Sequence, residues 1–377
     1  MAVPPPQGLS IALVSTEQDW GGGEEQARLL AEGLRRRGNR CTVFARSDGR
    51  LARRMAEAGF PLVGLSGSGR NPASLWRIRQ HLRRLRPDVL HYNDSHALTA
   101  AGLAALGLGI PARIAARRVL FPLRWRLPYR RLADRVVCVS RAVAAVCRSA
   151  GLPERVLRVV YDGVDPDRVA GGDRQRGRRS LGIADAQLLL LTVAKLTDCK
   201  GHAFLLEALL GVFQRYPQAI AVLAGDGPLR GALHAHAARL GIGEKVRLVG
   251  HRQDVPDLIQ AADLFVLPSD REGLCSRLID VMLAGRPIVT TCAGGIPELV
   301  GSGAPLSDPV AWTVPPRDPK ALAAAVLSAL DHPDQCAAFV AGARQRAEHL
   351  FTADRMVDAT LQVYREVLEG YPNGRSL

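Results

Sequence analysis

Lysine is scarce in this chain of 377 residues, and acidic residues are scarce in its first half. Of 50 basic residues only four are lysines, and all four lie beyond residue 180. Residues 1–180 contain 32 arginines against 15 acidic residues, whereas residues 181–377 contain 18 basic and 21 acidic residues. The net charge therefore changes from +17 to −3 near the middle of the chain. Such a step, together with a usual domain length of about 100–200 residues, favours two domains over one.

Long apolar runs, paired cysteines and a targeting segment are also missing. No stretch reaches the ~20 apolar residues of a membrane-spanning helix, and the apolar run at residues 9–14 is shorter than the core of a signal peptide. The seven cysteines are scattered and form no Cys-x-x-Cys pair, which favours reduced thiols over disulfides or a zinc site. We therefore expect a cytoplasmic protein with an ordinary globular composition of 47% hydrophobic and 23% charged residues.

Short apolar segments alternate with stretches of helical spacing along both halves of the chain. In the first half the predicted strands lie at residues 10–15, 41–45, 61–65, 88–91, 113–116, 135–139 and 156–160. In the second half they lie at residues 188–194, 219–224, 246–249, 264–267, 288–291 and 312–314. Strands separated by helices need crossover connections, so each half is predicted to form a parallel sheet with helices on both faces. The predicted fold class is α/β, with two doubly wound, Rossmann-like domains.

A polar stretch at residues 170–180 interrupts this alternation. It holds three glycines and no apolar periodicity, which is typical of a linker. We therefore place a first domain at residues 1–169 and a second at residues 181–350, and we expect a C-terminal helix within residues 351–377 to pack back on the first domain. Open parallel sheets bind ligands beyond the carboxyl ends of their strands. By analogy with other proteins of this fold, two such domains would bind two substrates across a cleft.

A glycine-rich turn, Gly21-Gly22-Gly23, follows the first predicted strand and precedes a helix. Glycine lets the backbone approach a ligand closely, and the amino terminus of a helix favours an anion. The turn lacks the Gly-x-Gly-x-x-Gly spacing, which argues against a nicotinamide cofactor. A loop that binds phosphate or acceptor and a merely flexible turn are both open interpretations here.

Two of the four lysines, Lys195 and Lys200, follow the first strand of the second half, where a helix begins. Two ammonium groups beside a helix amino terminus are suited to a diphosphate. Surface lysines are common, but in a chain that otherwise uses arginine this pair is unusual. Gly250 and His251 end a neighbouring strand and would border the same site.

Two carboxylates lie near the end of a later strand. Glu272 is on the loop after that strand, and Asp280 is eight positions further along, on the helix that follows. In this arrangement one carboxylate can accept hydrogen bonds from sugar hydroxyls and the other from a ribose diol. The alternative is a helix-capping acid and a solvated acid on the helix surface.

In this order, the motifs resemble those of retaining glycosyltransferases of the family 4 type, which have the two-domain GT-B fold. The resemblance spans nearly the whole chain. The matching segments are Gly21-Gly22-Gly23, Asp162-Gly163-Val164-Asp165, Lys195 with Lys200-Gly201, Glu272 with Asp280, and Gly295-Ile296-Pro297-Glu298.

The resemblance implies transfer of a sugar from a nucleotide-sugar donor with retention of anomeric configuration. Lys195 and Lys200 would hold the donor diphosphate and stabilise the leaving group, while Glu272 would bind hydroxyls of the donor sugar. Asp280 would bind the ribose. Enzymes of this fold generally need neither a metal nor another cofactor, so none is expected. The backbone of three further residues would lie near the phosphates, namely Gly273, Leu274 and Cys275.

Three positions depart from the family pattern. Lys195 stands where the family has arginine, which keeps the charge but loses the planar fork of donors. Asp280 stands where the family has glutamate and is shorter by one methylene group, so donor preference could differ. Asp162 replaces the usual asparagine near the end of the first domain.

A histidine-containing segment at residues 91–97 follows the fourth predicted strand. It resembles the family pattern His-x-His-Asp-x-His, whose last histidine lies near the donor sugar. The resemblance makes His96 the candidate beside the reacting centre and Asp94 a second candidate. The alternatives are a helix-start histidine and an N-cap aspartate. His91, earlier in the segment, is expected to pack in the core.

Arginine is concentrated at residues 76–86 and 113–135, where Phe121, Trp125 and Tyr129 are interleaved with it. This composition suits contact with an anionic membrane surface. A solvated arginine-rich face is the plain alternative. A nucleic-acid groove would have similar composition, but no nucleic-acid-binding motif accompanies the charge, so no nucleic acid is expected.

The sequence therefore predicts a glycosyltransferase that acts on a glycan or lipid-linked acceptor, in synthesis of cell-envelope polysaccharide or lipopolysaccharide. It would work in the cytoplasm, at the inner face of the membrane. A nucleotide-sugar epimerase or a phosphorylase on the same fold is the enzymatic alternative. The departures at Lys195 and Asp280 leave open a GT-B protein that binds without turnover.

Overall fold

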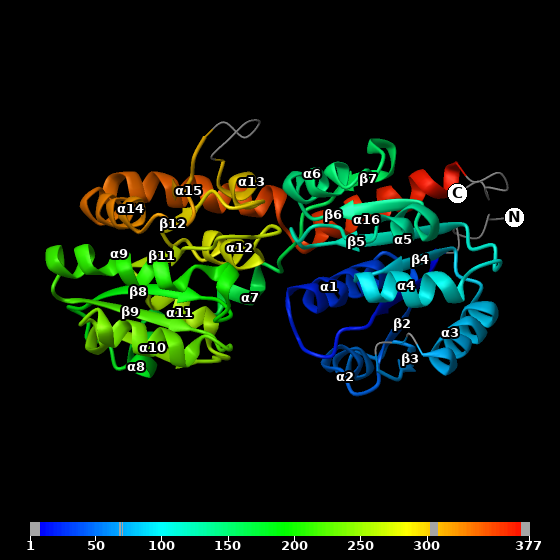
Figure 1. Ribbon diagram of the computed structural model, residues 1–377, viewed down its shortest axis with the longest axis horizontal. Coiled ribbons are helices and arrows are strands. Elements are labelled where there is room, and N and C mark those ends of the chain that lie inside the picture. The colour runs from blue at the N-terminus through cyan, green and yellow to red at the C-terminus, as the bar shows by residue number, and fades with distance from the viewer. Residues whose placement is uncertain (1–7, 68, 70, 302–307, 371–377) are drawn as a thin grey trace, which may run out of the picture. The chain divides into compact units, whose positions relative to one another are not determined.

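The computed structural model describes residues 8–67, 69, 71–301 and 308–370, which form two compact units. The first unit comprises the described parts of Met1–Gly163 and Ala353–Leu377, and the second comprises those of Val164–Thr352. Each unit is a parallel sheet with helices on both faces, as Figure 1 shows. The α/β class and the two doubly wound sheets predicted from the sequence are thus confirmed.

The first unit contains a seven-stranded sheet in the order β3-β2-β1-β4-β5-β6-β7. Its strands are β1 (Ser10–Ser15), β2 (Arg40–Arg46), β3 (Leu62–Leu65), β4 (Val89–Tyr92), β5 (Ala112–Arg117), β6 (Arg135–Cys138) and β7 (Leu157–Val159). Its helices are α1 (Gly22–Arg36), α2 (Arg50–Glu57), α3 (Pro72–Leu85), α4 (Ser95–Ala104), α5 (Arg126–Leu132), α6 (Arg141–Ser149) and α16 (Ala353–Glu369). Strand β1 is buried at every position because helices cover both faces of the sheet.

Helices α1, α2 and α16 share one core with the sheet, in which Leu34, Met55 and Tyr364 are fully enclosed. Figure 1 shows α16 in red beside β5 and β6, which it also contacts. The hydroxyl of Tyr364 is hydrogen-bonded to Nδ1 of His91 at 2.8 Å. The C-terminal helix therefore completes the core of the first unit. The expected C-terminal region extends to residue 377, and residues 371–377 lie outside the described part.

The second unit contains a six-stranded sheet in the order β10-β9-β8-β11-β12-β13. Its strands are β8 (Leu188–Val193), β9 (Ala219–Ala224), β10 (Val246–Gly250), β11 (Leu264–Leu267), β12 (Ile288–Thr291) and β13 (Trp312–Val314). Its helices are α7 (Asp167–Ala170), α8 (Arg174–Leu181), α9 (His202–Arg215), α10 (Arg230–Arg239), α11 (Val255–Ala261), α12 (Ser276–Leu283), α13 (Ile296–Val300), α14 (Pro319–Asp331) and α15 (Pro333–Leu350). Helices α9, α10 and α14 share the main core of this unit with the sheet.

The linker predicted at residues 170–180 is wrong, because most of this stretch is helix α8, folded within the second unit. Its polar residues make the contacts that apolar residues make elsewhere. Arg178 is buried and donates hydrogen bonds to the carbonyls of Ala184 and Ala261, at 2.6 and 3.1 Å. Gly177 allows close packing, since a Cβ there would lie 2.2 Å from the Asp257 carbonyl oxygen.

In each sheet the order in which successive strands are added reverses at one point. This point lies between β1 and β4 in the first unit and between β8 and β11 in the second. Loops that leave the carboxyl ends of such neighbouring strands border a crevice where ligands bind in folds of this kind. In the first unit one of these loops holds Gly21, and His96 lies in the first turn of the helix that follows β4. In the second unit the loops hold Lys200 and Glu272. Among the described residues, no helix combines the length and the apolar character needed to cross a membrane.

Candidate active site

Backbone hydrogen bonds join the loops at the carboxyl edge of the second sheet. The amide of Asp270 donates to the carbonyl of Cys199 at 2.9 Å, which ties the loop after β11 to the loop after β8. The amide of Gly295 donates to the carbonyl of Glu272 at 3.0 Å, which adds the loop after β12. These bonds hold the predicted donor-site loops in one rigid group.

Two glycines permit this close packing. Gly201 has φ +65°, and a Cβ there would lie 2.0 Å from the carbonyl oxygen of Pro268. Gly225 has φ +152°, and a Cβ there would lie 1.8 Å from the carbonyl oxygen of Ala194. Any side chain at either position would push the loops apart. Because Gly201 follows Lys200 directly, this contact sets the position of that lysine beside the loop after β11.

The structure brings together two of the predicted catalytic side chains, Lys200 and Glu272. The Lys200 ammonium donates to Oε1 of Glu272, and the hydroxyl of Ser269 donates to the same oxygen at 2.8 Å. Ser269 is fully buried, and its carbonyl accepts a hydrogen bond from the Thr291 hydroxyl. Glu272 is only 8% exposed, and no donor among the described residues reaches its Oε2. That second oxygen is therefore available to a hydroxyl group of a ligand.

The electrostatics of the pair keep Lys200 charged. Burial of the ammonium opposes its charge, but the neighbouring Glu272 carboxylate outweighs burial, so the pKa of Lys200 is raised above its ordinary value. The lysine is consequently a permanent cation at neutral pH. The pair also gives the buried carboxylate a counter-ion.

Lys195 differs from Lys200 in its surroundings. Its side chain is exposed, and within the described part of the chain no carboxylate pairs with it. Its carbonyl accepts a hydrogen bond from Nε2 of His202 at 3.1 Å, which fixes the backbone of the loop. Burial lowers the pKa of His202, so the imidazole is neutral. Lys195 therefore presents an exposed charge on a loop whose backbone is held by His202.

Three backbone amides just before helix α12 have no acceptor among the described residues. Cys275, its N-cap residue, has φ +84°, a left-handed conformation that is strained for a residue other than glycine. No acceptor in the described part of the chain pairs with the amides of Gly273, Leu274 and Cys275. A helix amino terminus with free amides suits a phosphate group. Burial raises the pKa of the Cys275 thiol to about 12, so the thiol is neutral.

Asp280 lies on α12, as predicted, but it is completely buried. Its Oδ2 forms ion pairs with Arg168 and with Arg277, the latter at 2.6 Å. Its Oδ1 is buried without a hydrogen-bond partner. The alternative of a solvated helix acid is therefore wrong.

Gly250 and His251 lie at the end of β10, as predicted. Gly250 has φ +71°, and its carbonyl accepts a hydrogen bond from the Gly225 amide at 2.8 Å. The side chain of His251 is exposed. The two residues therefore border the same edge of the sheet as Lys195 and Lys200.

In the first unit, His96 is an exposed residue in the first turn of α4. Asp94 is the N-cap of that helix and accepts a hydrogen bond from the Ala97 amide at 2.8 Å. Asp94 also accepts from the Thr16 amide at 2.8 Å and the Thr16 hydroxyl at 2.7 Å. The contact with the Ala97 amide is that of an N-cap, and the contacts with Thr16 join the end of β1 to the end of β4.

The glycine turn after β1 is tied to the end of β4. Gly21 caps α1 and donates its amide to the Glu24 carboxylate at 3.0 Å, and the side-chain amide of Asn93 donates to the Gly23 carbonyl at 3.2 Å. Gly22 has open space where a Cβ would stand. Hydrogen bonds therefore hold Gly21 and Gly23 in place, and the space beside Gly22 is open.

Sequence reasoning missed a partly buried polar network beside this turn. Arg118 donates to the side-chain oxygen of Asn93 at 2.9 Å and to Asp162 at 3.1 Å. Burial raises the pKa of Asp162, and the Arg118 charge partly offsets that rise. Asp162, which departs from the family pattern, therefore serves as a counter-ion to Arg118. A small cavity of about 10 Å³ lies beside Asp162 and His91.

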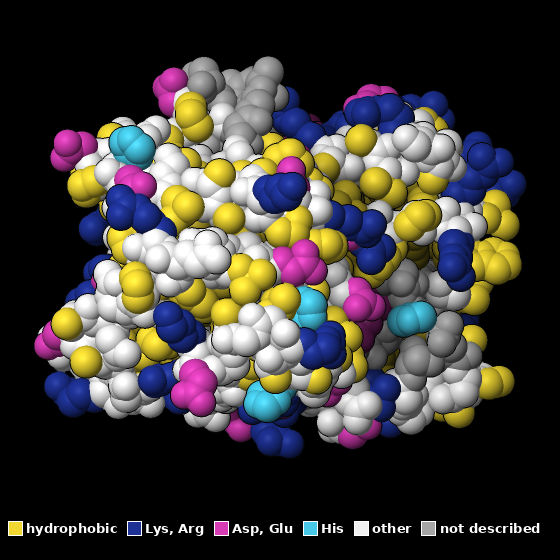
Figure 2. Space-filling view, turned by 60° about the vertical axis from the view of Figure 1, so that its left-hand side comes forward, with side chains coloured by type: hydrophobic (Ala, Val, Ile, Leu, Met, Phe, Trp, Pro, Cys, Tyr) yellow, Lys and Arg dark blue, Asp and Glu magenta, His cyan; other side chains and the backbone are white. Residues whose placement is uncertain are grey.

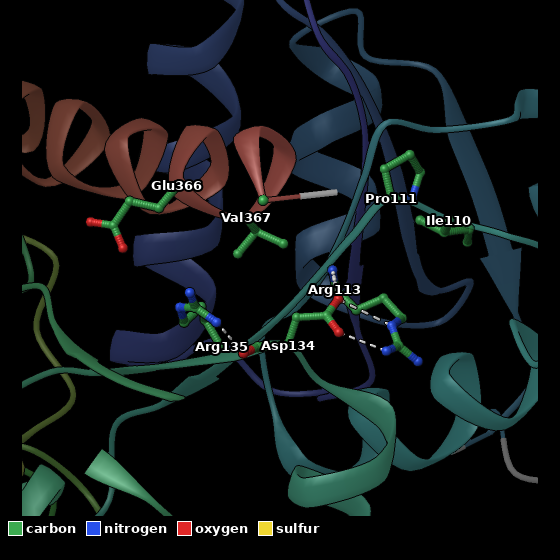
Figure 3. A pocket seen from close by; sticks show the side chains of 8 residues that line it. Ile110, Pro111, Arg113, Asp134, Arg135, Glu366 and Val367 are labelled. Atoms are coloured by element: carbon green, nitrogen blue, oxygen red, sulfur yellow. Dashed lines mark hydrogen bonds and ion pairs between the residues drawn. The ribbon is translucent and has the colours of Figure 1, made fainter. Parts of the chain in front are cut away.

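A larger cavity, of about 230 Å³, lies at the amino ends of β5 and β6 in the first unit. Figure 3 shows Arg113, Asp134, Arg135 and Glu366 around it, with Arg113 and Asp134 paired with each other. Glu366 is also paired, with Arg158 at 2.8 Å. This cavity is at the opposite edge of the sheet from the predicted ligand loops. Most of the charged side chains that line it are paired with each other or with a neighbouring residue.

Three further side chains in the second unit were not foreseen, those of Ser269, Arg277 and Arg168. Ser269 is three positions before Glu272 on the loop after β11. Arg277 is three positions before Asp280 on α12, a spacing that places side chains together on a helix. The second spacing could have been found in the sequence. Ser269 and Arg168 could not, because their contacts depend on how the loops fold. In the described part of the chain, no three side chains among His, Cys, Asp and Glu cluster as metal ligands would.

The fold is thus that of a two-unit α/β protein with two doubly wound sheets, the second of which has a lysine–glutamate pair at its carboxyl edge. Two family models match consecutive parts of the chain: Glycosyltransferase Family 4 at residues 20–168 and Glycosyl transferases group 1 at residues 173–346. Together they cover most of both units. The chain therefore belongs to the group 1 and family 4 type of glycosyltransferases.

Curated relatives agree with this assignment. D-inositol 3-phosphate glycosyltransferase 1 of Catenulispora acidiphila is 31% identical over 252 residues, which are 63% of this chain and 58% of that protein. The putative colanic acid biosynthesis glycosyltransferase WcaL of Escherichia coli is 30% identical over 289 residues, 70% of this chain and 66% of that protein. The matches cover 53% to 60% of the length of the first curated relatives.

Solved structures show the same fold. HepE of Anabaena, in complex with UDP and glucose, superposes with a TM-score of 0.82 at 23% identity, over 95% of this chain and 99% of that one. WaaG, a glycosyltransferase involved in lipopolysaccharide biosynthesis, superposes with a TM-score of 0.68 at 19% identity, over 95% and 99% of the two chains.

Proposed function

We propose that this protein transfers a sugar from a nucleotide-sugar donor to a glycan or lipid-linked acceptor, with retention of anomeric configuration. The observation that carries the proposal is the Lys200–Glu272–Ser269 group beside the free amino terminus of α12. It sets a cation and free amides next to a carboxylate with one unoccupied oxygen. A sugar diphosphate needs this combination, because its phosphates are anionic and its sugar carries hydroxyl donors.

In the proposed reaction the residues act mainly by electrostatics. Lys200, Lys195 and the amides that precede α12 neutralise the charge that develops on the leaving diphosphate. Glu272 holds donor-sugar hydroxyls through its free oxygen. The acceptor hydroxyl then bonds to the anomeric carbon on the face from which the diphosphate departs, and its proton passes to the departing phosphate oxygen. His96 would orient a sugar hydroxyl from the first unit.

The relatives suggest a cell-envelope role. WcaL is described as a colanic acid biosynthesis enzyme and WaaG as a lipopolysaccharide biosynthesis enzyme. HepE binds UDP and glucose, so a uridine nucleotide is the first donor to test. We propose an acceptor of this envelope class, handled at the cytoplasmic face of the membrane.

Titration of the purified protein with UDP, GDP and ADP tests the proposal most directly. One of the three should bind, and EDTA should not weaken binding or transfer because protein cations and amides neutralise the diphosphate. Absence of binding for every nucleotide would contradict the transferase proposal. If a nucleotide-sugar is isomerised without acceptor, the protein is an epimerase, and if inorganic phosphate serves as acceptor, it is a phosphorylase.

We also propose that the first unit contacts an anionic membrane through the segment at residues 119–131. Phe121, Trp125 and Leu127 are 55%, 78% and 61% exposed, and such a group of exposed large apolar side chains usually marks a binding surface. Seven arginines and no acidic residue lie between Asp94 and Asp134. Figure 2 shows one face of the molecule, on which dark blue basic side chains and yellow hydrophobic ones are interspersed throughout.

The base of this segment is fixed, which favours a preformed contact surface. Arg117 is buried and donates to the Phe121 carbonyl, and the adjoining Tyr129 is buried as well. Aromatic side chains at a membrane interface combine with basic residues that each contribute about 1 kcal/mol on an anionic surface. The nucleic-acid alternative is less favoured, because no nucleic-acid-binding motif accompanies the charge.

Co-sedimentation with vesicles tests the membrane contact. The protein should bind phosphatidylcholine vesicles that contain phosphatidylglycerol and not those without it. The double variant Arg124→Ala/Arg126→Ala should bind roughly 30-fold more weakly, because two interfacial charges contribute about 2 kcal/mol together. The matched control is Arg215→Ala/Arg344→Ala, which removes two arginines of the second unit whose side chains are 66% and 62% exposed. Equal binding of all proteins would contradict the proposed segment.

A further inference from the structure

The carboxylate of Asp280 is held through only one of its oxygens. Both Arg168 and Arg277 pair with Oδ2, whereas Oδ1 is buried and has no partner. Buried polar atoms in folded proteins are nearly always hydrogen-bonded, so an unpartnered carboxylate oxygen in a binding region needs an explanation. The natural explanation is a hydroxyl group supplied by a ligand.

The two arginines come from different parts of the chain. Arg277 is on α12 itself, three positions before Asp280. Arg168 is on the short helix α7, four positions after the chain enters the second unit at Val164. Helix α7 also contacts α12 directly. The position of Asp280 therefore depends on a helix that is remote in sequence from the donor motifs.

The guanidinium groups are less buried than the carboxylate they hold. Arg168 and Arg277 are 27% and 30% exposed at their side chains, whereas Asp280 is not exposed at all. They can therefore shift by a small amount when a ligand hydroxyl approaches, without uncovering the core. The carboxylate, fixed on its helix, cannot.

We infer that Arg168 is a positioning residue for the ribose of the donor, an inference that rests on the proposed function. It holds Oδ2 of Asp280 from one side while Arg277 holds it from the other, so that Oδ1 remains for a ribose hydroxyl. Without Arg168, the planar fork of Arg277 can take both carboxylate oxygens in a bidentate pair. Oδ1 would then be occupied, and the ribose would lose its acceptor.

The short side chain makes this arrangement necessary. An aspartate has one fewer rotatable bond than the glutamate of the family pattern, so its two oxygens stay close to helix α12 and to the guanidinium groups that pair with it. Which oxygen is free then decides whether Asp280 contacts ribose. Arg168 thus compensates for the substitution at position 280.

The experiment compares ribonucleotide with deoxyribonucleotide binding. The nucleoside diphosphate that binds best among UDP, GDP and ADP is titrated, together with its 2′-deoxy and 3′-deoxy analogues, by calorimetry. The proteins are the parent chain, Arg168→Ala, Arg168→Lys and, as matched control, Arg174→Ala. Arg174 pairs with Asp263 at 2.6 Å in the same unit, away from α12. Thermal unfolding of each variant checks that it is folded.

The parent should bind at least one deoxy analogue roughly tenfold or more weakly than the ribonucleotide, as expected for loss of a hydrogen bond to a charged group. Arg168→Ala should bind the ribonucleotide roughly tenfold more weakly and lose the discrimination. Arg168→Lys should restore part of it, since the charge remains but the fork does not. In turnover assays the KM for donor should rise in Arg168→Ala while kcat stays within about twofold.

Two results would overturn the inference and leave the proposed function intact. One is a parent protein that binds ribo and deoxy nucleotides equally. The other is an Arg168→Ala variant that keeps full discrimination, or loses it only to the extent that Arg174→Ala does. Absence of binding by any nucleotide would instead contradict the proposed function and this inference together.

Discussion

At the scale of single residues, the acidic side chains of the candidate site are paired with basic ones. Lys200 satisfies Glu272 in the described structure, and a bound diphosphate would compete for the same ammonium group. Asp280 is likewise satisfied on one oxygen and open on the other. Each buried acid thus has a counter-ion and one remaining acceptor, which suits ligands that bring hydroxyl groups and negative charge together.

Replacement of Glu272 by alanine should separate binding from transfer. Glu272→Ala removes the contact to donor-sugar hydroxyls, and transfer should fall by roughly 10²–10⁴-fold. Nucleoside diphosphate affinity should be kept or increase, because Lys200 loses its competing carboxylate. Calorimetry and a product assay measure the two effects, with Glu348→Ala, an exposed acid paired with Arg344, as control. Unchanged turnover would remove Glu272 from the site.

Replacement of Lys200 by alanine should have the opposite effect on affinity. Lys200→Ala leaves the Glu272 carboxylate without its counter-ion beside the diphosphate, so nucleotide binding should weaken roughly 10–100-fold. The loss should exceed that of Lys195→Ala, because Lys195 has no such carboxylate. The double variant Lys200→Ala/Glu272→Ala should recover part of the affinity in the same titration. Equal affinity of Lys200→Ala and the parent protein would contradict the diphosphate clamp.

At the scale of elements, strands were predicted better than short helices. All thirteen strands named from apolar segments are present, because strands covered on both faces leave a plain apolar signal. Helices α5, α7, α8 and α13 were not predicted. They are short, and α8 buries an arginine against backbone carbonyls, so its sequence shows no apolar periodicity. Only the tertiary structure reveals that these short segments are helical.

The loop before α9 offers a test at this scale. Gly201→Ala would force a left-handed residue to carry a Cβ 2.0 Å from the Pro268 carbonyl oxygen. The variant should lose more than about 1 kcal/mol of unfolding free energy and bind nucleotide more weakly, because Lys200 moves with the loop. Gly231→Ala is the control, since nothing lies within 4 Å of a Cβ in that helix. It should stabilise α10 by about 0.5–1 kcal/mol. Similar denaturation midpoints for both variants would contradict the predicted packing.

At the scale of the whole molecule, the second unit is continuous in sequence and the first is not. The chain enters the second unit at Val164 and leaves it at Thr352, and the Val164 amide donates to the Phe351 carbonyl at 2.9 Å. The residues at which the chain enters and leaves the second unit are therefore neighbours in space. Helix α16 then completes the first unit, where the Tyr364 hydroxyl meets His91.

This long-range contact predicts acid sensitivity of the first unit. Burial lowers the pKa of His91 to about 3, so the folded state keeps the imidazole neutral while the unfolded state takes up a proton below pH ~6.5. Stability should therefore fall as the pH drops from 6.5 towards 3, by about 1.4 kcal/mol per pH unit from this group. His91→Gln removes this contribution.

Carboxylates also titrate in this pH range, but they do so in both the variant and the parent. The difference in stability between the two proteins therefore reports on His91. His91→Gln should be less stable than the parent at pH 7, because it disturbs the contact with Tyr364. The difference should shrink or reverse by pH 4.5. Calorimetric unfolding at both pH values measures it, and a constant difference would contradict a buried neutral histidine.

The sequence by itself determined the two parallel sheets and the positions of the donor motifs, because both depend on local patterns of apolar residues, glycines and charges. It also indicated the basic character of the first half. Only the tertiary structure decided which residues meet: Ser269 with Glu272, Arg168 with Asp280, and α16 with the first sheet. The reason is physical. Periodicity is set within an element, whereas the partner of a buried charge is set by whichever segment the fold brings within a few ångströms.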